Sequence, residues 1–90
     1  MGESREIKEA REWYNKAKST LPPLPKHIDS RSGCKVGWYT YRTMTDAKIA
    51  AQHARLDAEW MSFLGYDFGW QVPGHIDQDK KRRRYTVTFP

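Results

Sequence analysis

The chain has 90 residues, a net charge of +5 and one cysteine, Cys34. This length leaves room for one domain, residues 1–90, and a single cysteine excludes an internal disulfide and a cysteine-rich zinc site, as is typical of a reducing cytoplasm. Because no apolar run approaches the roughly 20 residues of a membrane-spanning helix, we expect a cytoplasmic protein with no membrane segment.

The first predicted element is a helix from Ser4 to about Thr20. Its apolar residues recur every three or four positions, Ser4 is a suitable N-cap, and Glu6 lies in the first turn, where the helix dipole favours an anion. The proline-rich run Leu21–Pro25 must end this helix, because proline lacks a backbone donor. We expect an extended connector there or, alternatively, a ligand for an aromatic-lined groove. Residues 26–35 are predicted to form a loop.

A first strand is predicted over Val36–Tyr41, where β-branched and aromatic residues predominate. Because side chains alternate between the two faces of a strand, Trp38 and Tyr39 must point in opposite directions. We expect Trp38 to face the core, which leaves Tyr39 and Tyr41 on the outer face.

A long helix is predicted over residues 46–64, with Thr45 as its N-cap and Gly65 in the left-handed position that ends many helices. At about 100° per residue, this helix has two apolar sides. One side is almost entirely alanine and is expected to lie against a sheet, whereas the other is bulky and is expected to receive the N-terminal helix or a second subunit. The alanine side consists of Ala47, Ala50, Ala51, Ala54, Ala58 and Met61, and the bulky side of Ile49, Leu56, Trp60 and Phe63.

Two further strands are predicted at 66–72 and 85–89, where apolar and polar residues alternate. The first of these would place Phe68 and Trp70 on the core face. A strand–helix–strand crossover leaves room for the last strand between the first two, so the sheet order is 1-3-2 or, alternatively, 1-2-3. The predicted fold is therefore α+β, with an N-terminal helix followed by β-α-β-β, and a small three-stranded sheet packed on helix 46–64.

A basic run lies in the long loop predicted between the last two strands. It consists of five consecutive cations, Lys80, Lys81, Arg82, Arg83 and Arg84. Their mutual repulsion is relieved when they bind a polyanion that releases its own counterions, so the run predicts contact with the phosphates of RNA or DNA. The alternative is a solvated loop whose charge is partly balanced by Asp77 and Asp79.

Tyr39, Tyr41 and the adjacent Arg42 are candidates to extend this binding surface. Aromatic side chains on an exposed sheet face can stack on single-stranded bases. The alternative is that the two tyrosines pack across strands against Thr86 and Thr88.

The sequence contains no recognisable catalytic constellation, and we expect neither a metal nor a cofactor. His53 and Asp57 are four residues apart on the long helix, but two ligands fall short of a zinc site, and a hydrogen bond between them is the simpler interpretation. A nucleophile pair of Cys34 with a histidine has no activating geometry in the sequence. The chain is therefore predicted not to be an enzyme.

Two non-enzymatic functions follow from these patterns. The first is a small basic protein that binds RNA or DNA through residues 80–84 with aromatic support. The second is an inhibitory accessory protein that binds and blocks a host protein or nucleoprotein complex, and in general character the chain resembles such small proteins of viruses and mobile elements. Its candidate interface is Trp13, Trp60 and Phe63, since large aromatic residues are enriched at interfaces. We expect a monomer or a homodimer.

Overall fold

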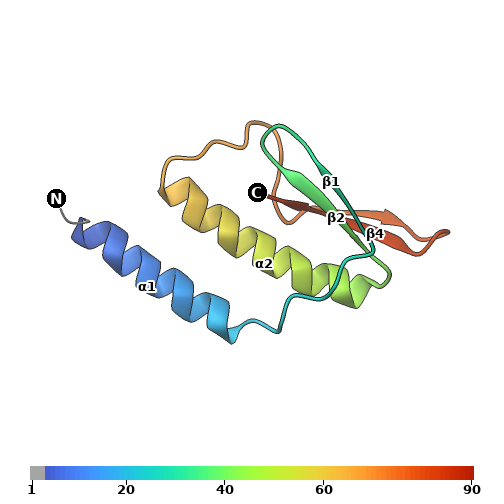
Figure 1. Ribbon diagram of the computed structural model, residues 1–90, viewed down its shortest axis with the longest axis horizontal. Coiled ribbons are helices and arrows are strands. Elements are labelled where there is room, and N and C mark those ends of the chain that lie inside the picture. The colour runs from blue at the N-terminus through green and yellow to red at the C-terminus, as the bar shows by residue number, and fades with distance from the viewer. Residues whose placement is uncertain (1–3) are drawn as a thin grey trace.

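The computed structural model of the protein describes residues 4–90, which form two helices and a four-stranded antiparallel sheet, an α+β fold. In chain order the elements are α1 (Arg5–Thr20), β1 (Asp29–Ser32), β2 (Gly37–Tyr41), α2 (Met44–Phe63), β3 (Ile76–Asp79) and β4 (Arg84–Phe89). The two helices run antiparallel with α2 between α1 and the sheet, and hairpin β3–β4 projects at the end opposite the start of α1 (Figure 1). No helix within the described residues is long and apolar enough to cross a membrane.

Helix α1 begins and ends where the sequence indicates. Its N-cap is Ser4, whose hydroxyl accepts a hydrogen bond from the backbone nitrogen of Ile7 at 3.2 Å, and Glu6 lies in its first turn. The helix ends at Leu21, whose backbone is extended, and the following prolines continue without regular secondary structure. The predicted helix and its extended connector are therefore confirmed.

Helix α2 begins two residues earlier than predicted. Its N-cap is Thr43, whose hydroxyl accepts a hydrogen bond from the backbone nitrogen of Asp46 at 3.1 Å. The prediction of Thr45 as the cap is wrong, because Thr45 already lies inside the helix. At the other end, the prediction for Gly65 is confirmed: it has a φ of 97°, and its backbone nitrogen donates to the carbonyl of Ser62 at 3.0 Å.

The alanine side of α2 packs against the sheet, as predicted. Four of its alanines are fully buried together with two large residues of the sheet, Tyr41 on β2 and Val87 on β4. These alanines are Ala47, Ala50, Ala51 and Ala54. Because a methyl group is the smallest side chain after that of glycine, the helix lies close to the sheet and leaves room for the Tyr41 ring.

The bulky side of α2 receives α1, but only in part. The ring of Tyr14 on α1 stacks on Trp60 with a centroid separation of 5.6 Å, and Trp60 stacks in turn on Phe63 at 6.1 Å. Phe63 is nevertheless 51% exposed, and α1 contains no buried residue. The first helix is therefore attached along one seam and is not enclosed by the fold.

Polar contacts complete the attachment of α1 and the connector. The carboxylate of Asp57 on α2 accepts hydrogen bonds from the Tyr14 hydroxyl and from Lys18 Nζ, the latter at 2.8 Å. His53 Nε2 lies 2.7 Å from the carbonyl oxygen of Pro22. The predicted hydrogen bond between His53 and Asp57 is wrong, because each of the two side chains binds a segment outside α2.

The sheet has the order β1-β2-β4-β3, and β1 was not predicted. Residues 26–35 were expected to be loop, but Asp29–Ser32 pairs antiparallel with β2. All four residues of β1 are exposed, so this edge strand is held by backbone pairing and has no apolar pattern that reveals it. The last strand does lie between β2 and β3, as the order 1-3-2 requires, and the alternative order 1-2-3 is wrong.

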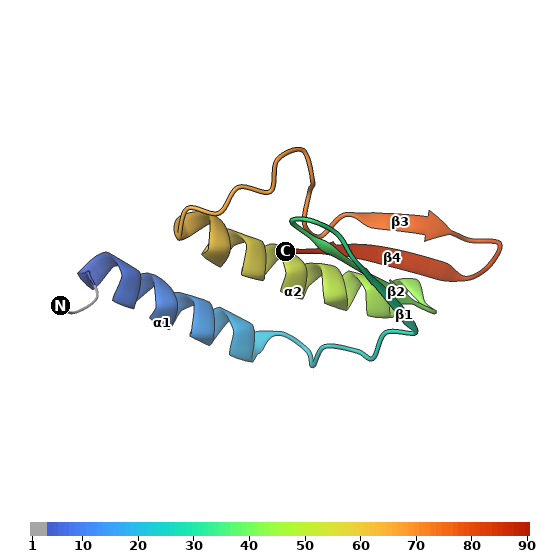
Figure 2. The same cartoon turned by 45° about the horizontal axis from the view of Figure 1, so that its top comes forward.

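The strand predicted at 66–72 is also wrong. This segment belongs to a loop that leaves the end of α2, passes the β1–β2 turn and returns at β3 (Figure 2). Trp70, expected on the core face, is 86% exposed. The strand that pairs with β4 is instead Ile76–Asp79, which shortens the predicted long charged loop to a tight turn.

The two faces of the sheet are the reverse of the prediction. Pairs directly opposite each other in an antiparallel sheet share a face, so the buried Tyr41 and Val87 identify the face toward α2. Tyr39 is paired with Val87 and also points toward the helix. Trp38 and Thr40 therefore lie on the opposite, outer face, which neither α1 nor α2 covers, although Thr40 and Thr88 on this face are themselves buried.

Candidate nucleic-acid interface

The predicted basic run spans the tight turn between β3 and β4 and ends at Arg84, the first residue of β4. Its five side chains are all exposed. The Asp79 carboxylate accepts a hydrogen bond from the backbone nitrogen of Arg82 at 3.2 Å, and Arg83 adopts a left-handed φ of 52°. Arg82 Nε lies 4.0 Å from Asp79 Oδ2. The turn thus places a dense group of cations at one end of the molecule. Within residues 4–90, Asp79 is the acidic residue that contacts them.

Arg42 joins this group through the register of the sheet. Tyr41 pairs with Tyr85, so continuing the β2–β4 register by one residue places Arg42 opposite Arg84. Arg42 and the arginines of the turn line one hollow of about 370 Å³. We call this site the arginine hollow, and it is lined by Ile28, Arg42, Thr43, Arg82, Arg83 and Arg84.

The electrostatics of the arginine hollow are unbalanced. Across residues 4–90 the structure records no ion pair for Arg42, Arg83 or Arg84. Arg84 has Asp79 opposite it on β3, but on its other side the extended register places it beside Arg42, and like charges so placed repel each other. A phosphate or carboxylate in the hollow would remove this repulsion and could accept several guanidinium hydrogen bonds at once. The hollow therefore has the chemistry of an anion site.

The two tyrosines predicted to support this surface lie elsewhere. Tyr41 is 1% exposed, and burial, together with the nearby Tyr39 and Asp46, raises its pKa. Tyr39 makes edge-to-face contacts with His27 at 4.8 Å and with Phe89 at 4.9 Å. Their predicted place on the outer face is wrong, because they form the inner wall of the sheet. The alternative of packing against Thr86 and Thr88 is wrong for the same reason.

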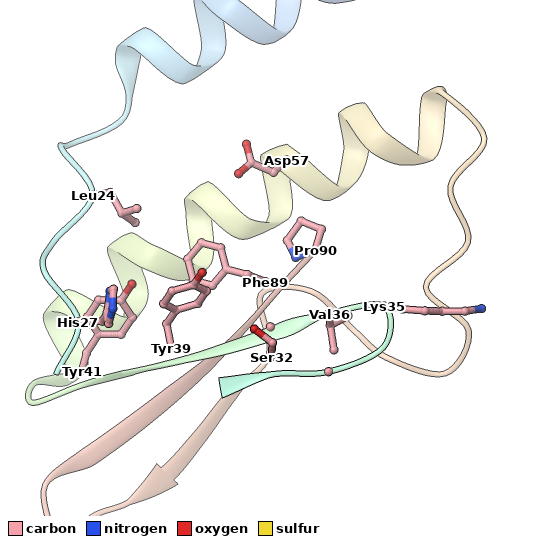
Figure 3. Close-up of a pocket in the computed structure, with 12 residues that line it drawn as sticks. Leu24, His27, Ser32, Lys35, Val36, Tyr39, Tyr41, Asp57, Phe89 and Pro90 are labelled. Carbon is pink, nitrogen blue, oxygen red and sulfur yellow. The ribbon is translucent and has the colours of Figure 1, made fainter. Parts of the chain in front are cut away.

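The inner face borders a groove of about 510 Å³ between the connector, α2 and the sheet (Figure 3). Tyr39, Tyr41 and Phe89 line it, and Figure 3 shows Asp57 across its opening while Lys35 points away. The Asp57 carboxylate already accepts the hydrogen bonds from α1. The groove therefore has an aromatic wall on its sheet side and a mixed polar and apolar lining elsewhere.

The outer face carries a different set of side chains, which the sequence interpretation missed. Thr40 and Thr86 face each other with their hydroxyl oxygens 2.9 Å apart. Next to them, the guanidinium of Arg31 lies 4.9 Å from the ring centroid of Trp38. One sequence signal does identify this face: β4 alternates threonines with Tyr85, Val87 and Phe89, and the threonines mark its outer side.

Two hollows lie on the outer face, each lined in part by these threonines. The first, of about 210 Å³, is lined by Asp29, Ser30, Arg31, Trp38, Thr40 and Thr86. The second, of about 400 Å³, is lined by Arg31, Trp38, Trp70, Gln71, Val72, His75, Asp77 and Thr88. The two hollows adjoin at Arg31 and Trp38, which line both, and the exposed Trp70 lines the second; together we call them the track.

The candidate protein interface lies on the helices, away from the sheet. Trp13 on α1 is 50% exposed and Phe63 at the end of α2 is 51% exposed, whereas Trp60 stacks between Tyr14 and Phe63. Two of the three predicted residues are therefore largely open, and the third holds α1 in place.

Other candidate chemistry does not assemble in the described part of the chain. Within residues 4–90, no group of three or more histidine, cysteine, aspartate or glutamate side chains is arranged to hold a metal ion. Cys34 is a free, exposed thiol. The histidine considered as a metal ligand, His53, is buried against the connector.

Comparison with known proteins adds no family or function: no family model, no curated protein and no solved structure matches the chain.

Proposed function

We propose that this protein binds RNA or DNA without acting as an enzyme, and that it contacts the phosphates through the arginine hollow and the exposed Lys80 and Lys81. The observation that carries the proposal is the convergence of four arginines from two parts of the chain on one hollow of about 370 Å³. Guanidinium groups bind phosphate oxygens bidentately, and neutralising phosphates releases counterions, which supplies most of the affinity of nonspecific nucleic-acid binding.

Arg42 is stronger evidence for a binding site than the basic turn is. A basic loop alone is often only a solvated surface, but Arg42 is far from the loop in sequence and is brought to it by strand pairing. Like charges placed opposite each other repel, and Asp79, the carboxylate registered opposite Arg84 on β3, forms its recorded ion pair within residues 4–90 with Arg82 and not with Arg42 or Arg84. The pair Arg42–Arg84 is therefore better explained as part of a binding site than as a solubilising surface.

The experiment compares two double variants that remove the same charge. Arg42→Gln with Arg84→Gln removes two cations from the hollow, and Lys8→Gln with Lys16→Gln removes two exposed cations from α1. At about 0.1 M salt, the first variant should bind a fluorescently labelled oligonucleotide about 10- to 50-fold more weakly, because two phosphate contacts are lost. The second should bind within about twofold of the unaltered protein.

Equal weakening of both double variants would show that only net charge matters and would refute the assignment of the hollow. Because Arg42 and Arg84 are exposed side chains that repel each other, circular dichroism should be unchanged and the urea midpoint should not fall, which separates lost binding from lost folding.

A second candidate function, an inhibitory accessory protein that binds a host protein or nucleoprotein complex, is supported by a separate observation. Trp13 and Phe63 expose half of their surface on neighbouring helices, and such aromatics often anchor protein partners. This function predicts that a captured partner survives nuclease treatment and is released by Trp13→Ser with Phe63→Ser. Under the first proposal, nuclease removes the partner and the aromatic substitutions have no effect.

A further inference from the structure

The outer sheet face lies next to the arginine hollow along β4. Arg84 and Thr86 are two residues apart on β4 and therefore point to the same side, and Arg42 directly follows the end of β2, two residues after Thr40. Beyond the threonines lie Trp38 and then Trp70. From Arg84 to Thr88, which is paired with Trp38, the outer face along β4 is about 13 Å long, at roughly 3.3 Å per strand residue.

The aromatic end of this track is built by two distant segments. The ring of Trp38 lies close above the β1–β2 turn, where a side chain added at Gly33 would come within 2.7 Å of it. Trp70 lies in the loop after α2, where the backbone nitrogen of Gly69 donates to Asp67 Oδ1 at 2.8 Å. The two tryptophans line a shared hollow of about 400 Å³ with Arg31.

The exposure of Trp70 requires an explanation. An indole that is 86% exposed gains almost nothing from burial in the folded chain. The local turn, with Gly69 at a φ of 64° and a hydrogen bond from the nitrogen of Gln71 to the carbonyl of Phe68 at 3.2 Å, orders the backbone on both sides of it. An ordered loop that presents a bare aromatic ring beside a cationic side chain is suited to stacking with a planar ligand.

The charges beside the track favour one strand over two. The central strands β2 and β4 carry arginine, threonine and tryptophan on the outer face, whereas Asp29 on β1 and Asp77 and Asp79 on β3 flank them. Asp79 contacts Arg82, and Asp77 Oδ1 lies 3.2 Å from His75 Nε2. A single phosphate backbone can lie along the basic end of the central strands β2 and β4, but the second backbone of a duplex would approach these carboxylates.

From this arrangement we propose that the outer sheet face binds single-stranded nucleic acid, with phosphates in the arginine hollow and bases stacked on Trp70 and against Trp38. The inference rests on the proposed function and names its substrate class. Aromatic rings can stack only on bases that are splayed out, which a duplex does not offer, and such stacking tolerates any base. The occupant is therefore a single strand bound with little sequence preference.

The test uses two labelled probes, an oligothymidine of about ten nucleotides and a mixed-sequence duplex of the same length. Trp70→Ala should weaken binding of the single strand roughly 5- to 100-fold and leave duplex binding unchanged. Trp13→Ala, which removes another half-exposed tryptophan, should change neither. Trp70→Phe should restore much of the affinity, because a phenyl ring still stacks.

Intrinsic fluorescence supplies a second measurement that does not depend on affinity. The oligothymidine should quench the tryptophan emission of the unaltered protein, and the share that comes from Trp70 should disappear in Trp70→Phe while binding is retained; unchanged quenching in this variant would contradict stacking on Trp70.

The outcomes separate the inference from the proposal on which it rests. If Arg42→Gln with Arg84→Gln weakens binding but Trp70→Ala does not, the stacking face is refuted and the arginine hollow stands. If the duplex binds as tightly as the single strand and Trp70→Ala affects both equally, the preference for a single strand is refuted. If neither probe binds the unaltered protein, both proposals fail.

Discussion

The hydroxyl of Tyr14 donates a hydrogen bond to the carboxylate of Asp57, and this contact ties the otherwise exposed helix α1 to α2. Lys18, one turn further along α1, donates to the same carboxylate oxygen at 2.8 Å. The Tyr14 ring also stacks on Trp60. One carboxylate and one ring therefore fix the position of a helix of 16 residues that buries no side chain completely.

Replacement of Tyr14 by phenylalanine keeps the ring stacking and removes only the hydroxyl. We expect a loss of about 1 kcal/mol in the docking of α1, since Asp57 retains Lys18 and is partly solvated. Amide hydrogen exchange should become faster throughout α1 and remain unchanged in β2 and β4. Equally faster hydrogen exchange in β2 and β4 would show that α1 does not detach independently of the sheet, which would contradict this account.

The same contact predicts a loss of stability at high pH. Burial, the hydrogen bond to Asp57 and the charge of Asp57 raise the pKa of Tyr14 to about 12, from 10.0. Because the folded state holds this proton more tightly, the contribution is complete below pH 10 and is lost as the pH rises toward 12. Burial also raises the pKa of Tyr41, which acts in the same direction.

Urea unfolding at pH 9 to 11.5 measures this pH dependence, because the range includes the ordinary tyrosine pKa of 10.0 and approaches the pKa of about 12 that Tyr14 has in the folded protein. The free energy of unfolding should decrease as the pH rises through this range, and the decrease should be smaller in Tyr14→Phe. An unchanged slope in this variant would show that Tyr14 does not titrate with α1 docking.

Two glycines provide a matched test of how the loop after α2 meets the helix. Gly65 and Gly74 have similar left-handed φ angles, 97° and 90°. A side chain at Gly65 would meet open space, but one at Gly74 would lie 2.4 Å from Arg55 Cγ and 3.2 Å from the carbonyl oxygen of Ala51. Gly65→Ala should therefore cost only the backbone strain, about 1–2 kcal/mol, and Gly74→Ala more. Equal urea midpoints for the two variants would contradict this packing.

The alanine side of α2 should not tolerate larger residues. Ala51 is fully buried against the sheet, so Ala51→Leu should lower the free energy of unfolding by about 1–3 kcal/mol through overpacking. Its neighbour Gln52 is exposed, and Gln52→Leu should change stability by less than about 0.5 kcal/mol. Thermal unfolding of the two variants measures the difference, and a stabilised Ala51→Leu variant would reveal a cavity that the structure does not contain.

The parts of the fold that the sequence predicted are those with a local physical cause. Ser4, Gly65 and the row of alanines act through caps and helical spacing, which are visible within a few residues. Strand β1 could not be predicted, because Asp29–Ser32 has no apolar pattern and pairs through its backbone alone. Residues 66–72 show the opposite error, since their alternation is typical of a strand but no neighbouring strand pairs with them.

The candidate site was likewise predicted only in part from the sequence. The basic run is evident in the sequence, but the contribution of Arg42 depends on the register in which Tyr41 pairs with Tyr85. The choice between the faces of β2 was undecidable locally, because tryptophan and tyrosine are both suited to a core. The buried partner Val87 decides it, and that information lies on another strand.

The central claim, that Arg42 after β2 and the arginines of the β3–β4 hairpin bind phosphates together, is tested most directly by the salt dependence of oligonucleotide binding. For the unaltered protein, the logarithm of the association constant should fall linearly with the logarithm of the salt concentration. Arg42→Gln with Arg84→Gln should make the slope shallower by about 1.4 to 1.8, roughly 0.7 to 0.9 for each lost phosphate contact, and Lys8→Gln with Lys16→Gln should leave it unchanged. A slope near zero for the unaltered protein, or equal slopes for all three proteins, would contradict the claim.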